Sequence, residues 1–270
     1  MERFDMIHTA LNSKKIIVTG ASSGIGEQLC KKIAENGGIP IMLARSEDKL
    51  LAIQMDLKLE LQTESYIYKV DLQDNDDIDF TIQTILAEHE QIHGLINNAG
   101  IGVFDAVEDM KWLDLHEMFQ LNVFSLMRIT QLLIPHFNQY KLGHIINVAS
   151  QAGKISTPKS AAYGASKHAV IGFTNTLRQE MDSKGIYVTA VNLGPVRTNF
   201  FKVADPSGSY RQSVDRYMLD PQQVANTIVR YLFTKKREIN MPFWMEAGSV
   251  FYRLFPGLME KLLRSSFNKK

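Results

Sequence analysis

Tyr163 and Lys167 lie four residues apart in the segment AAYGASKHA, and Ser150 lies thirteen positions before the tyrosine. In a helix, side chains at i and i+4 share one face, so the phenol and the ammonium come within reach of each other. A nearby positive charge favours the phenolate and lowers the pKa of a phenol from its usual value of about 10. Such a phenol can exchange a proton with a carbonyl or alcohol oxygen while a hydride moves. These residues predict an oxidoreductase site.

A glycine-rich segment, TGASSGIG at residues 19–26, joins a predicted strand to a predicted helix. Gly20, Gly24 and Gly26 permit positive φ angles and close backbone approach, and the N-terminus of a helix offers N–H groups to a diphosphate. The spacing G-x-x-x-G-x-G fits the general dinucleotide fingerprint only loosely. The segment could also be a turn that eases strand–helix packing, but its place after the first strand favours nucleotide binding.

The end of the second predicted strand indicates which dinucleotide binds. About twenty residues after the glycines, an NAD-binding protein places an acid for the ribose 2′-hydroxyl. This chain has Arg45 and Ser46 there, and a guanidinium and a hydroxyl suit a 2′-phosphate. We therefore predict NADP(H) in preference to NAD(H). Asp71, after the third strand, either accepts from the adenine amino group or caps the following turn, and the sequence leaves both open.

Strand and helix patterns that alternate along the chain must position these residues. Strands are expected at 15–19, 39–44, 65–70, 95–97, 144–149, 187–193 and 238–241. Helices are expected at 24–36, 47–61, 76–89, 113–139, 163–183 and 221–234. Apolar runs with little alternation indicate strands buried on both faces. The chain is therefore predicted to be α/β: a single Rossmann-type domain with a doubly wound parallel sheet of about seven strands flanked by helices.

The composition narrows the class of protein. A chain of 270 residues, 45% of them hydrophobic, suits one sizeable domain. Thirty basic residues balance twenty-nine acidic ones, so we expect no nucleic-acid partner. The single cysteine, Cys30, cannot form an internal disulfide, which favours a cytoplasmic setting. The start MERFDMIH lacks the apolar core of a signal peptide, and no apolar run approaches the ~18 residues of a membrane span. No metal site is predicted.

Seven ordered segments resemble the short-chain dehydrogenase/reductase family, in its TGxxxGxG and YxxxK subgroup. They are TGASSGIG at 19–26, VDL at 70–72, NNAG at 97–100, Asn122, Ser150, YGASK at 163–167 and, as a close match, NLGPVRT at 192–198. The resemblance covers residues 14–241, and the combination is far more specific than any one segment.

The resemblance implies a role for each of four catalytic residues. Tyr163 would exchange the proton with the substrate oxygen, and Ser150 would hydrogen-bond that oxygen. Lys167 would hold the nicotinamide ribose hydroxyls and lower the pKa of the tyrosine. Asn122 would hold a water that links Lys167 to solvent, although it could instead satisfy carbonyls at a helix kink.

The resemblance and the residue chemistry together give one set of predicted cofactor contacts. These are Gly20, Ser22, Ser23, Gly24, Ile25, Gly26, Arg45, Ser46, Asp71, Leu72, Asn98, Ala99, Gly100, Tyr163, Lys167, Pro195, Val196 and Thr198. Val196 and Thr198 would grip the nicotinamide carboxamide. The chain departs from the family in having Leu193 where proline is usual and no basic residue in the glycine loop, so the NADP(H) preference rests on Arg45.

Three segments surround or interrupt the predicted core of residues 14–241. Residues 1–13 form an N-terminal extension, and residues 199–220 form a substrate loop. The aromatic residues of that loop line an apolar pocket or anchor a surface helix; they are Phe200, Phe201, Tyr210 and Tyr217. Residues 242–270 form an amphipathic C-terminal extension that Pro256 divides in two. It packs on its own core or on a sister subunit, borders the substrate entrance, or lies on a membrane surface, and the sequence favours packing.

The sequence predicts an NADP(H)-dependent carbonyl reductase or alcohol dehydrogenase for a small to medium apolar substrate. The alternative enzyme is a 3-oxoacyl carrier-protein reductase, although the long C-terminal extension argues against it. An alternative of another class is a sensor that binds NADP(H) without turnover, but such a protein tends to lose the tyrosine or the lysine. By resemblance, we expect a homodimer or homotetramer that pairs through the helices at 113–139 and 163–183.

Overall fold

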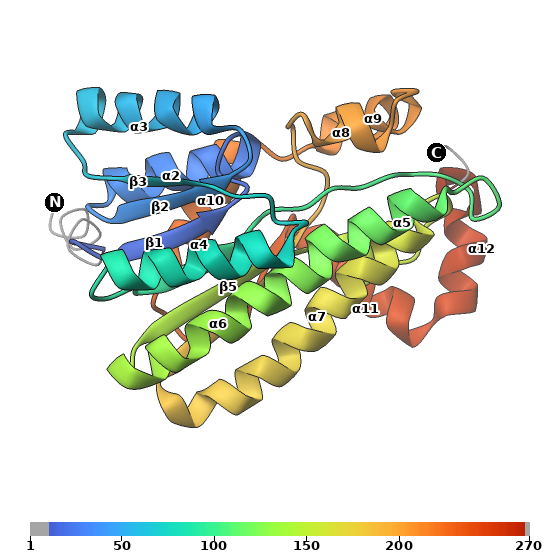
Figure 1. Ribbon diagram of the computed structural model, residues 1–270. Coiled ribbons are helices and arrows are strands. Elements are labelled where there is room, and N and C mark those ends of the chain that lie inside the picture. Colours follow the sequence, from blue (N-terminus) through green and yellow to red (C-terminus); the bar gives the residue numbers. More distant parts are fainter. Residues whose placement is uncertain (1–10, 268–270) are drawn as a thin grey trace, which may run out of the picture.

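The computed structural model describes residues 11–267, so most of the predicted extension 1–13, and residues 268–270, lie outside the described residues. A seven-stranded parallel sheet with the order β3-β2-β1-β4-β5-β6-β7 forms the centre (Figure 1). Its strands are β1 (Lys15–Thr19), β2 (Ile39–Ala44), β3 (Tyr66–Lys69), β4 (Gly94–Asn97), β5 (Gly143–Ser150), β6 (Ile186–Leu193) and β7 (Glu238–Met241). The predicted Rossmann-type single domain is confirmed.

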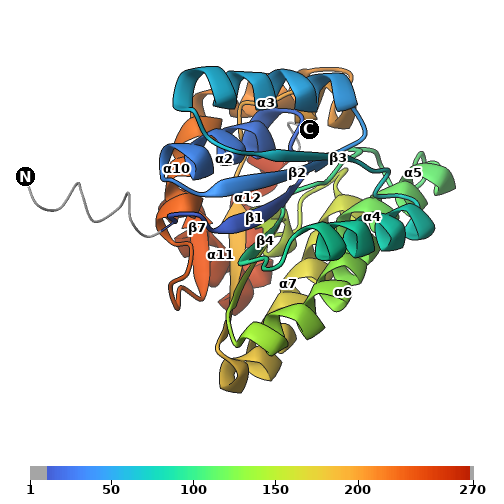
Figure 2. The ribbon, with the colours of Figure 1, turned by 60° about the vertical axis from the view of Figure 1, so that its left-hand side comes forward.

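Helices cover both faces of the sheet (Figure 2). One apolar core lies under α2 (Gly24–Glu35), α3 (Glu47–Leu61) and α10 (Pro221–Arg230). A second lies under α4 (Asn75–Glu88), α6 (Ser125–Tyr140) and α7 (Ala161–Met181). The strand order reverses between β1 and β4, and in such sheets ligands bind outside the carboxyl ends of the strands at this reversal.

The predicted helix 113–139 is interrupted. It consists of α5 (Trp112–Phe119), a π-helical turn (Gln120–Phe124) and α6. The wider turn carries Asn122, whose side chain binds the backbone of Ile101 on the neighbouring loop. A π-turn has i→i+5 bonds, which a 3.6-residue apolar period does not reveal. The predicted helix 221–234 also ends early, because α10 stops at Arg230 and a turn follows.

The substrate loop and the C-terminal extension contain short helices near the carboxyl ends of the strands (Figure 1). The loop contains α8 (Phe200–Ala204), α9 (Ser209–Val214) and a 3-10 turn (Asp215–Tyr217). The extension forms α11 (Phe243–Leu254) and α12 (Pro256–Phe267), and Pro256 begins the second helix. Within residues 11–267, no helix combines the length and the hydropathy needed to cross a membrane.

Candidate active site

A cavity of about 860 Å³ lies at the carboxyl ends of β1, β2, β4, β5 and β6. Every predicted site residue lines it except Gly26 and Asn122. The fold therefore brings together the glycine loop, the NNAG segment, the serine, the tyrosine and the lysine, which are spread over residues 19–167. Gly26 and Asn122 contact residues that line the cavity, as described below.

The glycine loop has the close-packed geometry that a dinucleotide site requires. Gly20 and Gly24 have positive φ angles of 65° and 60°, which side chains rarely adopt. A Cβ on Gly26 would lie 2.1 Å from the carbonyl oxygen of Gly20, so only glycine lets α2 begin against the loop. The N-cap residue Ser23 makes no side-chain capping bond, so the first-turn N–H groups of α2 are available to an anion. This loop fits a bound diphosphate.

Thr19 and Asn98 fix the glycine loop to the neighbouring strand end. The Thr19 Oγ1 accepts from the backbone N–H groups of Asn98 and Ala99, both at 3.0 Å. The Asn98 Nδ2 donates to the carbonyl oxygen of Thr19 at 2.9 Å. Sequence reasoning missed Thr19; its position, as a polar residue that ends an apolar strand before glycine, was the available signal. The backbone of the NNAG segment is thereby held along the cavity wall.

The residues predicted to select the cofactor lie at the end of β2 and after β3. Arg45 is exposed and Ser46 is half-buried, and both line the cavity. Among residues 11–267, no acidic side chain forms a salt bridge with Arg45, so the guanidinium is available to a phosphate. The Asp71 carboxylate accepts from the backbone N–H of Gln73 at 3.0 Å. It therefore caps the turn, which is one of the two roles that the sequence left open. Its second oxygen can still serve an adenine, because a carboxylate has two acceptors.

The segment after β6 crosses the glycine loop. Pro195, Val196 and Thr198 line the cavity, and Thr198 approaches so closely that a Cβ on Gly24 would lie 3.1 Å from its Cγ2. The Thr198 Oγ1 accepts from the backbone N–H of Phe200 at 3.3 Å. The segment after β6 therefore lies next to the glycine loop, where the nicotinamide end of a dinucleotide would lie if the glycine loop held its diphosphate.

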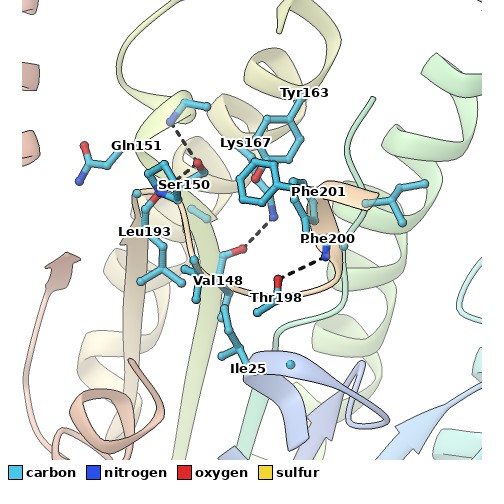
Figure 3. Close-up of a pocket in the computed structure, with 18 of the residues that line it drawn as sticks. Ile25, Val148, Ser150, Gln151, Tyr163, Lys167, Leu193, Thr198, Phe200 and Phe201 are labelled. Carbon is cyan, nitrogen blue, oxygen red and sulfur yellow. Dashed lines mark hydrogen bonds between the residues drawn. The ribbon is translucent and has the colours of Figure 1, made fainter. Parts of the chain in front are cut away.

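Ser150 and Tyr163 lie close together in the cavity lining (Figure 3). The Ser150 Oγ accepts from the backbone N–H of Ala152 at 3.1 Å and donates to the carbonyl oxygen of Leu193 at 3.2 Å. Burial raises the pKa of Tyr163 to about 12; its hydrogen bond with Ser150 works in the opposite direction, and the nearby Tyr210 adds to the rise. The phenol is therefore the protonated, acid form at neutral pH.

Lys167 does not lower the pKa of Tyr163 in this structure, so the expected direction is wrong here. The Nζ donates to the carbonyl oxygen of Val148 at 3.0 Å and lies 5.9 Å from the centre of the tyrosine ring (Figure 3). Lys167 is only 5% exposed, and burial lowers the pKa of its ammonium to about 8. Burial disfavours the charged form of both groups, and it is the largest cause of both shifts.

Asn122 supports the site from behind the cavity wall. Its Oδ1 accepts from the backbone N–H of Ile101 at 2.8 Å, and its Nδ2 donates to the carbonyl oxygen of Ile101 at 2.9 Å and to the Ser166 Oγ at 3.1 Å. A Cβ on Gly100 would lie 3.0 Å from this Oδ1 and 3.4 Å from the Nζ of Lys167. Asn122 therefore joins the loop after β4 to α7, and its water-holding role stays a prediction.

Aromatic rings enclose the tyrosine on the substrate side. The ring centres of Phe104 and Phe200 lie 5.7 and 5.6 Å from that of Tyr163, and Phe104 also packs on Tyr210 at 5.3 Å. Phe201 and Tyr217 line the same cavity, so the pocket-lining interpretation of the loop aromatics holds. Sequence reasoning missed Phe104, because nothing in its irregular loop marks one aromatic residue as facing the site.

The C-terminal extension borders the same cavity, one of the three arrangements that the sequence left open. Trp244, Met245, Gly248 and Tyr252 of α11 line it, together with Met259 of α12. The helix is held by Lys154, a residue that sequence reasoning also missed. Its Nζ lies 2.7 Å from carboxylate oxygens of both Glu238 and Glu246.

Comparisons with known proteins agree with this geometry. The family model described as short chain dehydrogenase matches residues 14–207. Dehydrogenase/reductase SDR family member 7B of Danio rerio is 29% identical over 270 residues, covering 96% of this chain and 87% of the relative.

Two solved structures show the same fold. A short-chain dehydrogenase from Sphingobium yanoikuyae in complex with NADPH has a TM-score of 0.78 at 24% identity, covering 90% of this chain and 96% of that chain. A 3-ketoacyl-(acyl-carrier-protein) reductase from Brucella melitensis complexed with NADH has a TM-score of 0.76 at 24% identity, covering 86% and 98%. These neighbours include both an NADPH and an NADH complex, so likeness to them leaves the cofactor preference open.

Proposed function

This chain belongs to the short chain dehydrogenase family, and from that premise we propose that it transfers a hydride between NADP(H) and the carbonyl or hydroxyl group of an apolar substrate. One observation carries the proposal: the hydroxyl groups of Ser150 and Tyr163 and the ammonium of Lys167 face a single cavity that continues to the glycine loop. The glycine loop at one end of the cavity suits a phosphate, and aromatic rings line the other end.

The residues would act on a substrate carbonyl in the following way. Bound NADPH would supply the hydride to the carbonyl carbon. Tyr163, with its pKa at about 12, would hold its proton at neutral pH and give it to the carbonyl oxygen. Ser150 would donate to the same oxygen and stabilise the charge that develops there. Lys167 would bind the ribose hydroxyls while its ammonium remains charged. In the oxidising direction, Tyr163 would accept the proton of the alcohol.

The preference for NADP(H) rests on Arg45. Its exposed guanidinium lies at the end of β2 and lines the cavity, where a 2′-phosphate would take a charge-assisted, bidentate contact. Ser46 follows it with a hydroxyl and borders the same cavity. The two positions directly after β2 are Arg45 and Ser46, not a carboxylate that would accept from a 2′-hydroxyl or repel a phosphate.

The first test is a titration of NADPH and NADH by intrinsic fluorescence. We expect Arg45→Ala to weaken NADPH binding about tenfold or more, as removal of a charge-assisted contact does, and to leave NADH binding unchanged. Arg216→Ala is the matched control, because Arg216 borders the same cavity from within the substrate loop, so this substitution should not alter the ratio. Equal binding of both cofactors by the unaltered protein would contradict the NADP(H) assignment.

The second test screens carbonyl compounds with NADPH. We expect Tyr163→Phe to lower turnover about 10²–10⁴-fold while NADPH still binds, since it removes only the hydroxyl group that exchanges the proton. Selective turnover of 3-oxoacyl thioesters would favour the carrier-protein reductase instead. NADPH binding without turnover across the screen, or turnover that survives Tyr163→Phe, would contradict the proposed reaction and favour the cofactor sensor.

Two wider parts of the proposal follow from the same family. We propose that copies of the chain pair through the helical layer of α5, α6 and α7, as the sequence resemblance implied. We also propose a cytoplasmic setting, because the single cysteine, Cys30, is buried and can form no internal disulfide.

A further inference from the structure

The two C-terminal helices form one wall of the cavity. Of the elements that line the cavity, they are the farthest in sequence from the glycine loop. Four α11 residues and one α12 residue line it; they are Trp244, Met245, Gly248, Tyr252 and Met259. The family match ends at residue 207, so this wall is built from sequence outside the matched segment. The chemistry of this wall therefore affects which substrates this protein accepts.

The wall is fixed in place beside the catalytic serine. Lys154 follows the short turn after Ser150, and its buried ammonium binds Glu246 of α11 and Glu238 of β7, at 2.7 Å each. Met245 packs against the turn after β6, where a Cβ on Gly194 would lie 2.6 Å from its Sδ. A helix held at both points can serve as a rigid boundary for a ligand.

The substrate side of the cavity has little charge. Of all the residues that line the cavity, those with a charge are Arg45, Asp71, Lys167 and Arg216. The first three belong to the proposed cofactor region, which leaves only Arg216 near the substrate. Aromatic rings from the loop and from α11 line the rest of that side, together with Met245, Met259 and Ile155 and with uncharged polar residues, which are Gln151, Thr157, Ser160, Asn199 and Ser213. A lining of large apolar groups with little charge suits an uncharged hydrocarbon portion of a ligand.

Gly248 leaves an open space in this wall. It is half-buried in the middle of α11, and a Cβ built on it would meet no heavy atom within 4 Å. Its φ is not positive, so the backbone does not require glycine, and glycine is unfavourable inside a helix. The missing side chain therefore enlarges the cavity rather than relieving strain.

We propose, on the basis of the proposed function, that the substrates are carbonyl compounds with an extended apolar chain that runs from Tyr163 toward α11, and that Gly248 sets the accepted chain length. The substrate carbonyl would contact Tyr163 and Ser150, and the apolar chain of the substrate would pass between the substrate loop and α11. A side chain at position 248 would shorten the space for this apolar chain and would not contact the catalytic groups.

The experiment measures kcat/KM with NADPH for unbranched methyl ketones from butanone to 2-tetradecanone. In the unaltered protein, we expect kcat/KM to rise by about fourfold per added methylene until the chain fills the cavity. Gly248→Leu should leave the short ketones unchanged and lower kcat/KM of the longest about tenfold or more. Equal values for every chain length in Gly248→Leu and the unaltered protein, or an equal loss at every length, would overturn the proposal.

Gly257→Leu is the matched control. Gly257 lies in α12, is exposed, has no heavy atom within 4 Å of a built Cβ, and does not line the cavity. Both substitutions replace glycine by a better helix former, so neither is expected to unfold the protein. The control should reproduce the chain-length series of the unaltered protein, and an identical truncation of the series by Gly257→Leu would overturn the assignment to position 248.

A second measurement separates failure of this inference from failure of the proposed reaction. The chain has two tryptophans, so Trp112→Phe leaves Trp244, a cavity residue, as the only indole. We expect 2-tetradecanone to shift the Trp244 emission and Gly248→Leu to weaken that binding about tenfold or more. Such binding without turnover of any ketone would overturn the proposed reaction alone; turnover of the ketones without chain-length dependence would overturn the present inference alone.

Discussion

At the scale of single residues, burial gives the two central titratable groups opposite shifts. It raises the pKa of Tyr163 to about 12 and lowers that of Lys167 to about 8. Below pH 8, the site therefore contains a protonated phenol and a charged ammonium. That combination can give a proton to a substrate oxygen.

The pH dependence of reduction should reveal this pair. We expect kcat/KM to stay level below pH 8 and to fall above about 8, as Lys167 loses its charge while Tyr163 keeps its proton. The fall should approach about tenfold per pH unit, as for the loss of one essential proton. Lys167→Arg keeps its charge to higher pH, so its profile should stay level where the unaltered protein declines. A level profile for the unaltered protein up to pH ~10, the usual range of a free lysine, would contradict the lowered pKa.

At the scale of elements, the sheet was predictable and the long-range contacts were not. All seven strands were expected. The apolar runs of the central strands record burial on both faces, whereas the edge strands β3 and β7 are only partly buried. The glycine, serine and tyrosine motifs were also readable, since each lies at a strand end or on one helix face. The π-turn around Asn122, the cavity position of Phe104 and the anchoring of α11 were missed. The Lys154 contacts show why: their partners are 84 and 92 residues away, and no local pattern encodes such a pairing.

The anchoring of α11 makes a prediction about stability. The Lys154 side chain is 7% exposed between Glu238 and Glu246, which are 23% and 17% exposed. Lys154→Met would leave two half-buried carboxylates without their cation, so we expect the free energy of unfolding to fall by about 3 kcal/mol. Urea denaturation at neutral pH measures this loss of stability.

A surface ion pair provides the comparison for Lys154. Arg197 and Asp215 form a pair whose side chains are 52% and 54% exposed, so Arg197→Met should cost less than about 1 kcal/mol. Glu246→Gln should fall between the two, because Lys154 keeps Glu238 as a partner. If Lys154→Met destabilised the protein no more than Arg197→Met, the ion-pair anchor would not hold α11.

At the scale of the whole molecule, the helices proposed for pairing have exposed apolar side chains that lie outside the cavity. The substrate loop and the C-terminal helices both border the cavity at the carboxyl ends of the strands. The helical layer of α4, α6 and α7 lies on the opposite side of the sheet from α3 (Figure 2). Trp112 and Leu113 of α5 and Phe124 of the π-turn are 75%, 64% and 48% exposed. Exposed large apolar side chains on these consecutive elements favour an interface at this face.

Pairing of two copies through this layer gives the last prediction. Phe124 borders a groove between α4, α6 and α7, together with Met127 and Phe173, so an aromatic ring there can act as an interface anchor. Light scattering should find a dimer or tetramer, and Phe124→Asp should weaken association by about 2 kcal/mol or more, roughly thirtyfold in Kd. Leu59→Asp on α3, where Leu59 is 72% exposed, removes a similar apolar side chain from the opposite layer and should leave the assembly intact. A monomeric unaltered protein, or equal dissociation by both substitutions, would contradict pairing through α6 and α7. The active site is built within one chain, so the Phe124→Asp monomer should still bind NADPH.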